Sequence, residues 1–293
     1  MNAIIFALKA ILTMKMKHLS IVALSLFLWS CGGSEHADST HNDSTEVAEE
    51  VAEPIDDLAD FKFHTMIANL PSPLETFHLI SGVSIAMDGV GLTPTEDSKK
   101  LSTTSAKAYG YGIYMTDMGF MAYEHENQKT LDYYQTCRDL AQSLGAGDVF
   151  DQTISANFEE NTSSEEKFVR MMDEAFKAMD EYMVGNERFV NATEIFVGSW
   201  VETQFIATSI IKDAPLNEEN KPLYQGIYDQ KMHAYNLMNV LGEIETELSP
   251  AVINQVEDIM MFYAGFSTVE SITSKDLHEL ETKLKSLKAA LTA

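Results

Sequence analysis

The chain has 293 residues, of which 45% are hydrophobic and 10% aromatic, enough apolar material for one large domain or two small ones. Asp and Glu total 45 against 20 Lys and Arg, a formal net charge of −25 that repels phosphate backbones and excludes nucleic-acid binding. With two cysteines in the chain, a disulfide-stapled scaffold and a cysteine-rich metal site are also excluded.

The N-terminus has the features of an export signal. Two lysines precede an apolar run over 19–30, which is too short to span a bilayer and has the length of a signal-peptide core. The run ends in Leu-Trp-Ser-Cys at 28–31, which resembles the lipobox of bacterial lipoproteins. The resemblance implies that 1–30 is a signal peptide that is removed and that the cysteine is lipidated. Because such a signal needs nothing before Met14, we expect translation to start at Met14 or Met16.

The signal is followed by an acidic segment. Residues 32–60 contain ten acids and neither Lys nor Arg, so they cannot bury enough apolar surface to offset the entropy of ordering. We therefore expect a disordered tether over 31–60 and a helical domain over 61–293. An acidic stretch after the lipidated cysteine resembles Bacteroidetes-type lipoproteins. The resemblance implies an anchor in the outer membrane through the lipid on Cys31, facing either the periplasm or the cell surface.

The remaining sequence contains the start and stop signals of a series of helices. Capping boxes with proline at the first helical position begin at Ser72 and Thr93, and Gly145, Gly185 and Gly242 suit C-terminal caps. No alternating β-branched run with a hairpin turn occurs. The pattern predicts an all-α, multi-helix bundle. Its nine helices are expected at 73–90, 94–125, 127–144, 148–160, 163–184, 187–212, 220–242, 249–270 and 274–291.

Two stretches within these predicted helices are apolar nearly all round. They cover 108–123 and 195–211, and such helices are typical of the buried centre of a bundle. Four short sequence matches in the same order indicate that 73–160 is duplicated in 163–270, with a C-terminal helix added. The alternative, that helical cores resemble one another without duplication, stays open. The unequal offsets between the matches exclude a short-period solenoid.

Asp117 and Glu202 are the candidate functional residues. Each is the only ionised side chain in the apolar stretch of a predicted central helix. A buried carboxylate costs several kcal/mol unless it is paired or hydrogen-bonded, so each needs a compensating group. Two interpretations stay open. One is a structural network, in which neutralising either acid destabilises the protein, and the other is a ligand site that also uses Tyr114, Trp200 and Gln204.

Two further motifs have metal-ligand spacing. Glu75 and His78 match half of a di-iron ligand set, but a second copy is missing and Glu75 serves a capping box. His278 and Glu281 have the spacing of a motif in imelysin-like lipoproteins, but Asp276 replaces the glycine expected there. We therefore expect neither a metal nor a cofactor.

Two packing features complete the sequence analysis. Cys137 falls in the apolar stripe of the helix predicted at 127–144 and is expected to be a buried, inert thiol. The last predicted helix carries leucines at alternating spacings of three and four, a seam that either packs on the bundle or docks a partner helix. The leucines are Leu277, Leu280, Leu284, Leu287 and Leu291.

These observations favour a non-enzymatic envelope lipoprotein whose helical body binds a protein or peptide partner or acts as a scaffold. The alternative is a lipoprotein that binds a small ligand or metal in a pocket around Asp117 and Glu202. An enzyme ranks third, because the sequence contains no Gly-rich phosphate loop, zinc-protease motif or serine nucleophile elbow.

Overall fold

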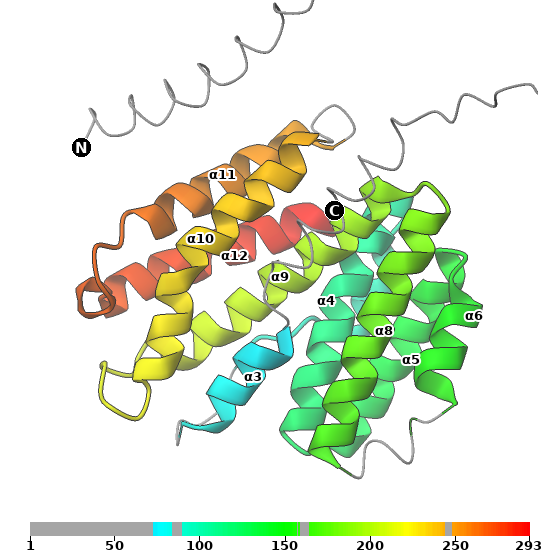
Figure 1. Cartoon of the computed structure of the whole chain (residues 1–293), viewed down its shortest axis with the longest axis horizontal. Helices are drawn as coiled ribbons and strands as arrows, with labels where there is room; N and C mark the ends of the chain where they lie inside the picture. Colours follow the sequence, from blue (N-terminus) through cyan, green and yellow to red (C-terminus); the bar gives the residue numbers. More distant parts are fainter. Residues whose placement is uncertain (1–72, 84–89, 157, 159–163, 244–247) are drawn as a thin grey trace, which may run out of the picture. The chain divides into compact units, whose positions relative to one another are not determined.

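The computed structural model describes residues 73–83, 90–156, 158, 164–243 and 248–293 (Figure 1). Within these ranges the chain is helical and forms no strand, which confirms the predicted all-α bundle. The predicted signal peptide, the lipidated cysteine and the acidic tether lie outside the described residues. Among the residues described, no helix is both long and apolar enough to cross a bilayer.

The helices follow the predicted order, with short 3₁₀ or π turns between some of them. The α-helices are α3 (Pro73–Ser81), α4 (Thr104–Tyr123), α5 (Asn127–Ser143), α6 (Gly147–Phe150), α8 (Glu165–Gly185), α9 (Phe189–Ile211), α10 (Lys221–Glu243), α11 (Pro250–Ala264) and α12 (Ser274–Leu291). The short turns are η1 (Thr95–Lys100), η2 (Asp151–Ser155) and η4 (Val269–Ser271).

The continuous helix predicted over 94–125 is wrong, because the chain breaks between η1 and α4. Thr103 has an extended backbone and caps α4, its Oγ1 accepting the N–H of Ala106 at 3.0 Å. Ser and Thr hydroxyls stabilise such caps better than helix interiors, which explains why the Ser-Thr-Thr-Ser run at 102–105 interrupts the helix. The helix predicted over 249–270 also ends early, at Ala264, where η4 follows after a short link.

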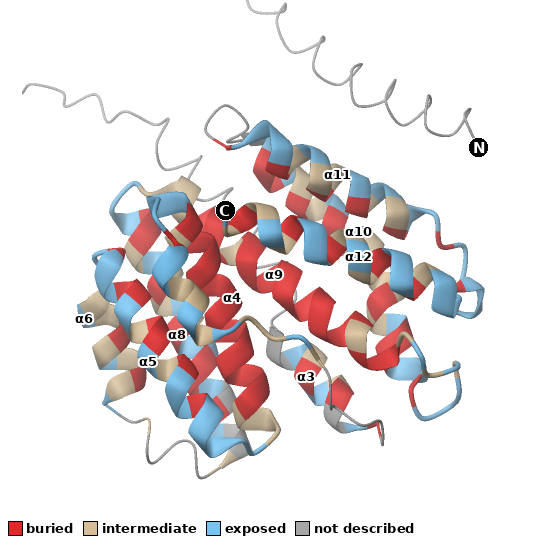
Figure 2. Cartoon of the chain, turned by 180° about the vertical axis from the view of Figure 1, so that it is seen from behind, coloured by how far each residue is buried: buried red, intermediate tan, exposed pale blue. Residues whose placement is uncertain are grey.

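Helices α4 and α9 are buried on nearly every side, as predicted for the centre of the bundle (Figure 2). They pack along each other, α5 covers another side of α4, and α12 covers another side of α9. Helices α10 and α11 pack together, α10 also contacts α9, and α11 contacts α12. The predicted duplication of 73–160 in 163–270 stays a prediction.

Glycines let the two central helices approach closely. A Cβ on Gly112 of α4 would lie 2.0 Å from the carbonyl oxygen of Ile195, and one on Gly198 of α9 would lie 2.1 Å from that of Tyr109. Real Cβ atoms do not come so near to backbone, so any larger residue at either position would force the helices apart. This crossing brings the polar groups of α4 and α9 together.

The two predicted packing features are confirmed. Cys137 is a free cysteine with 0% exposure, in the core on α5. All five leucines of α12 are at most 2% exposed, and α12 packs on α9 and α11 of the same chain. The leucine seam therefore serves the bundle itself and is not left free for a partner helix.

Candidate functional site: a buried acid pair with one lysine

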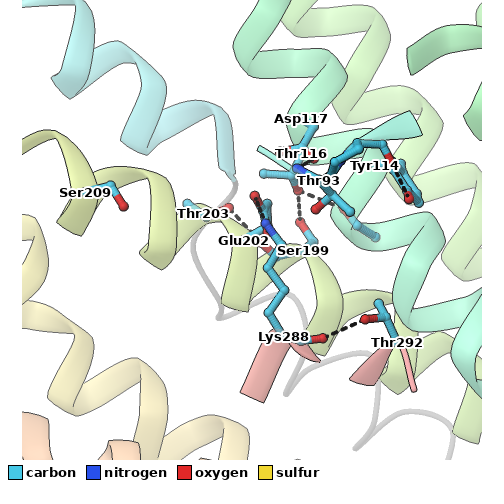
Figure 3. Close-up of polar contacts among 12 residues, drawn as sticks. Thr93, Tyr114, Thr116, Asp117, Ser199, Glu202, Thr203, Ser209, Lys288 and Thr292 are labelled. Atoms are coloured by element: carbon cyan, nitrogen blue, oxygen red, sulfur yellow. Dashed lines mark hydrogen bonds and ion pairs between the residues drawn. The ribbon is translucent and has the colours of Figure 1, made fainter. Parts of the chain in front are cut away.

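Asp117 and Glu202 face each other where α4 crosses α9 (Figure 3). Both side chains have 0% exposure, and the two carboxyl groups lie close enough to interact directly. The sequence predicted that each acid is buried and lacks a charged neighbour on its own helix. The structure adds that each acid is a neighbour of the other.

A hydroxyl pair holds the two helices in register beside the acids. Thr116 Oγ1 lies 2.9 Å from Ser199 Oγ, and it also donates to the carbonyl oxygen of Gly112 at 2.9 Å. Both hydroxyls are buried, and each lies close in sequence to one of the two acids. The glycine crossing and this hydrogen bond together explain why the carboxyl groups meet.

Lys288 supplies the positive charge at the site. Its Nζ donates to Glu202 Oε1 at 2.6 Å and lies 2.5 Å from Oε2, and its side chain is 12% exposed. The same Nζ lies 4.6 Å from the ring centre of Phe205, one turn further along α9. An ammonium over an aromatic face is stabilised further, most when desolvated. Lys288 therefore fastens α12 to α9 at the acid pair.

The segment before η1 supplies a hydrogen bond to the second acid. The backbone N–H of Thr93 donates to Asp117 Oδ2 at 3.1 Å. Two tyrosines hold this segment in place, since Tyr133 donates to the carbonyl oxygen of Thr93 at 2.9 Å and Tyr114 to that of Pro94 at 3.0 Å. Tyr114 thus belongs to the surroundings of the acid pair, as the sequence suggested, although it acts through the backbone.

The electrostatics separate the two acids. Burial, and then the charge of Glu202, raise the pKa of Asp117 well above its ordinary value, while Lys288 and the Thr93 N–H act in the opposite direction. Glu202, by contrast, is in direct contact with the ammonium group of Lys288. The arrangement is a glutamate paired with a lysine, beside an aspartic acid whose burial opposes its ionisation.

Trp200 and Gln204 are not part of this cluster. Trp200 Nε1 donates to Gln230 Oε1 of α10 at 3.0 Å, and Gln204 Oε1 accepts the hydroxyl of Tyr263 of α11 at 3.2 Å. Successive helical residues turn by about 100°, so residues two positions from Glu202 point to the opposite side of α9. The polar side chains of α9 therefore lie on two opposite sides of the helix: Glu202 faces α4 and α12, whereas Trp200 and Gln204 face α10 and α11.

The sequence motifs with metal-ligand spacing have other partners. No group of three or more His, Cys, Asp or Glu side chains suited to a metal ion occurs among the residues described. His278 Nε2 lies 2.9 Å from Asp213, and Glu281 accepts from Lys212 at 2.6 Å, so both motif residues tie the start of α12 to the end of α9. Glu75 and His78 are exposed on α3.

Sequence reasoning missed Lys288, Thr93 and Tyr133. Lys288 stands four residues after Leu284 and three before Leu291, both buried, so helical periodicity places it on the flank of the packed face. That position was a usable signal for a lysine directed into the bundle. Nothing in the sequence connects it with Glu202, which lies 86 residues earlier.

Fold and site define an all-α bundle whose two central helices share a buried acid pair neutralised in part by a lysine of the last helix. No protein family, curated protein or solved structure matches the chain. Cys31, the predicted lipidation site, lies outside the described residues.

Proposed function

We propose that this chain is a lipid-anchored helical protein of the outer membrane, without enzymatic activity, that binds a protein or peptide partner or acts as a scaffold. The lipobox at 28–31 and the acidic segment at 32–60 support the anchor. The scaffold role rests on one observation, which is how the polar groups of the central helix are used.

The three side chains of α9 that were candidates for ligand binding, together with Ser199, connect α9 to four other helices. They reach α4, α10, α11 and α12 through hydrogen bonds between buried or nearly buried groups. The connections are Ser199–Thr116, Trp200–Gln230, Gln204–Tyr263 and Glu202–Lys288. Side chains that cross-link a core favour a rigid body, and a rigid body that presents a surface suits a scaffold.

Exposed apolar side chains on α10 and α11 support a partner-binding role. Met232 and Tyr235 on α10 are 58% and 46% exposed, and Met261 on α11 is 43% exposed. Aromatic residues and methionine are enriched at protein interfaces relative to other surface, so this face is the first place to look for a partner. Leu131 on α5, 48% exposed, offers a comparison position on another helix.

The alternative is a small-ligand or metal-binding lipoprotein that uses the acid pair. One observation favours it, because no described residue forms a hydrogen bond with Asp117 Oδ1 or with the hydroxyl of Thr93, both of which are buried. Isothermal titration with metal ions and with small cationic ligands tests this alternative. Binding that is lost in both Asp117→Asn and Glu202→Gln would favour it over the scaffold.

The anchor is tested by expressing the full chain in a Gram-negative host with a labelled fatty acid. Wild-type protein and the control Cys137→Ser should carry label and sediment with membranes, whereas Cys31→Ser should do neither. Labelled, membrane-bound Cys31→Ser protein would contradict the lipidation proposal.

The partner is tested with a photoreactive residue at 232 on α10 or, as the control, at 131 on α5. Cross-linking in cells to one defined protein from 232 and not from 131 is the expected result. Identical products from both positions would contradict a specific partner on the α10–α11 face, and no product from either would leave the scaffold as the remaining proposal.

A further inference from the structure

One oxygen atom of the acid pair, Asp117 Oδ1, lacks a hydrogen-bond donor. Asp117 Oδ2 accepts the Thr93 N–H and Glu202 Oε1 accepts Lys288. Among the described residues nothing donates to Asp117 Oδ1, whereas Glu202 Oε2 lies 2.5 Å from the ammonium group of Lys288. Buried acceptors without a donor are rare and costly, so this arrangement needs an explanation.

The charge balance of the site also indicates that the acid pair binds a proton. Two ionised carboxylates and one ammonium group would leave one negative charge uncompensated at a site where both acids have 0% exposure. An unpaired buried charge costs several kcal/mol, and proteins avoid it by binding a proton instead. A protonated carboxyl group also becomes a donor. One proton would therefore neutralise the excess charge and supply the missing hydrogen bond.

We propose that Asp117 and Glu202 form a buried proton-binding site that holds one proton between their carboxyl groups at neutral pH. Release of this proton places two carboxylates in contact opposite a single lysine, and their repulsion loosens the junction of α4, α9 and α12. The site makes the stability of the bundle depend on pH, a property beyond the proposed scaffold function.

The titratable groups around the acid pair do not contribute to this pH dependence near neutral pH. The titratable neighbours of the acids are Tyr114 on α4, Tyr133 and Cys137 on α5, and Lys288 on α12. Burial raises the pKa of both tyrosines and of the Cys137 thiol, so these three groups stay neutral near pH 7. Burial likewise raises the pKa of Asp117 well above its ordinary value.

The sign of the pH dependence follows from where the proton is bound. Above about pH 4 an aspartate in the unfolded chain has lost its proton, whereas the native pair keeps one. Because the native state then binds more protons, stability falls as pH rises, by about tenfold in the folding equilibrium constant per pH unit. The loss ends where the native pair releases its proton.

The test compares wild type with Asp117→Asn as full chains between pH 5 and pH 7. Urea unfolding is followed by the fluorescence of Trp200, which is 3% exposed. The asparagine amide replaces the O–H donor without needing a proton. We therefore expect the folding constant of Asp117→Asn, divided by that of wild type, to rise about tenfold per pH unit and about a hundredfold over this range. A ratio that stays constant would overturn the proposal.

Two further measurements control for the loss of a surface charge and for a variant that does not fold. Asp139→Asn, on the exposed side of α5, is the matched control and should leave the pH dependence of wild type unchanged. The infrared spectrum of native wild type at pH 7 should show the C=O band of a neutral carboxylic acid. If Asp117→Asn does not fold, this band decides alone, and its absence from wild type would overturn the proposal.

Discussion

Replacing Lys288 with methionine removes the cation that is bonded to Glu202 while nearly keeping the volume of the side chain. The carboxylate of Glu202 is 0% exposed and Lys288 is 12% exposed, so water cannot take the place of the ammonium group. Removing one partner of such a buried pair costs about 3–5 kcal/mol. Most of the cost is the charge left behind, since methionine fits irregular core space.

The Lys288→Met variant can limit this loss of stability by binding a proton at Glu202. The free energy needed to bind that proton then sets how large the loss is and how it depends on pH. A glutamate in the unfolded chain ionises near pH 4.3, and each pH unit above that is worth about 1.4 kcal/mol. Keeping Glu202 neutral therefore costs about 3–4 kcal/mol at pH 7 and about 1 kcal/mol at pH 5. We expect the loss of unfolding free energy for Lys288→Met to stay near these values.

The matched control is Lys283→Met, on the same helix. Lys283 also forms an ion pair with another helix, with Asp258 of α11 at 2.5 Å, but the two side chains are 24% and 55% exposed. An exposed ion pair contributes at most about 1 kcal/mol, so the control should lose little stability at either pH. Urea unfolding of both variants and wild type at pH 7 and pH 5 measures the difference. Equal losses in the two variants, or a Lys288→Met loss that does not shrink at pH 5, would refute the reasoning.

Three further predictions concern the crossing, the thiol and the two acids. Gly198→Ala should lower the unfolding free energy by about 1–3 kcal/mol or more, because the added Cβ would meet a carbonyl oxygen of α4. A Cβ added at Gly242 would have no atom within 4 Å, so Gly242→Ala should be neutral or slightly stabilising in the same urea titration. A thiol reagent should not modify Cys137 in the folded protein and should do so on unfolding, because burial raises the pKa of this thiol and no part of it is exposed. At pH 7 Glu202→Gln should be about 1–3 kcal/mol less stable than Asp117→Asn, since only the former loses the charged bond to lysine; equal thermal stability would contradict the assigned roles.

The sequence treats the two acids as equivalent, and the structure separates them. Each is an isolated charge in an apolar helix, so periodicity alone predicts burial and destabilisation by either neutralisation. Glu202 contacts Lys288, whereas Asp117 accepts only the Thr93 N–H and has a pKa that burial raises well above its ordinary value, so the proposed proton is assigned to Asp117. The variant Asp117→Asn is therefore expected to become more stable relative to wild type as pH rises. The sequence alone predicted only that it would be destabilised.

Local features were accessible from the sequence because they depend on neighbouring residues. The apolar faces of α4 and α9, the leucine face of α12 and the buried Cys137 all follow from helical periodicity. The start of α4 was missed because Thr103 competes as a cap with a proline capping box ten residues earlier, and only packing selects between them. Trp200 and Gln204 were grouped with Glu202 by closeness in sequence, although helical geometry alone already places them on the opposite side.

Which polar groups meet was decided only by the tertiary structure. The carboxyl groups of Asp117 and Glu202 come close together because Gly112 and Gly198 allow the two backbones to approach closely. A glycine in a sequence does not indicate which backbone it will face. Lys288 comes from 86 residues away, at the end of a helix whose leucines specify burial but not the neighbour. An apolar helix face is recognised from neighbouring residues and can pack against many different partners. The sequence by itself therefore determined the helices and their buried faces. Charge pairing depends on distances of a few ångströms between remote residues, and these exist only once the bundle has assembled.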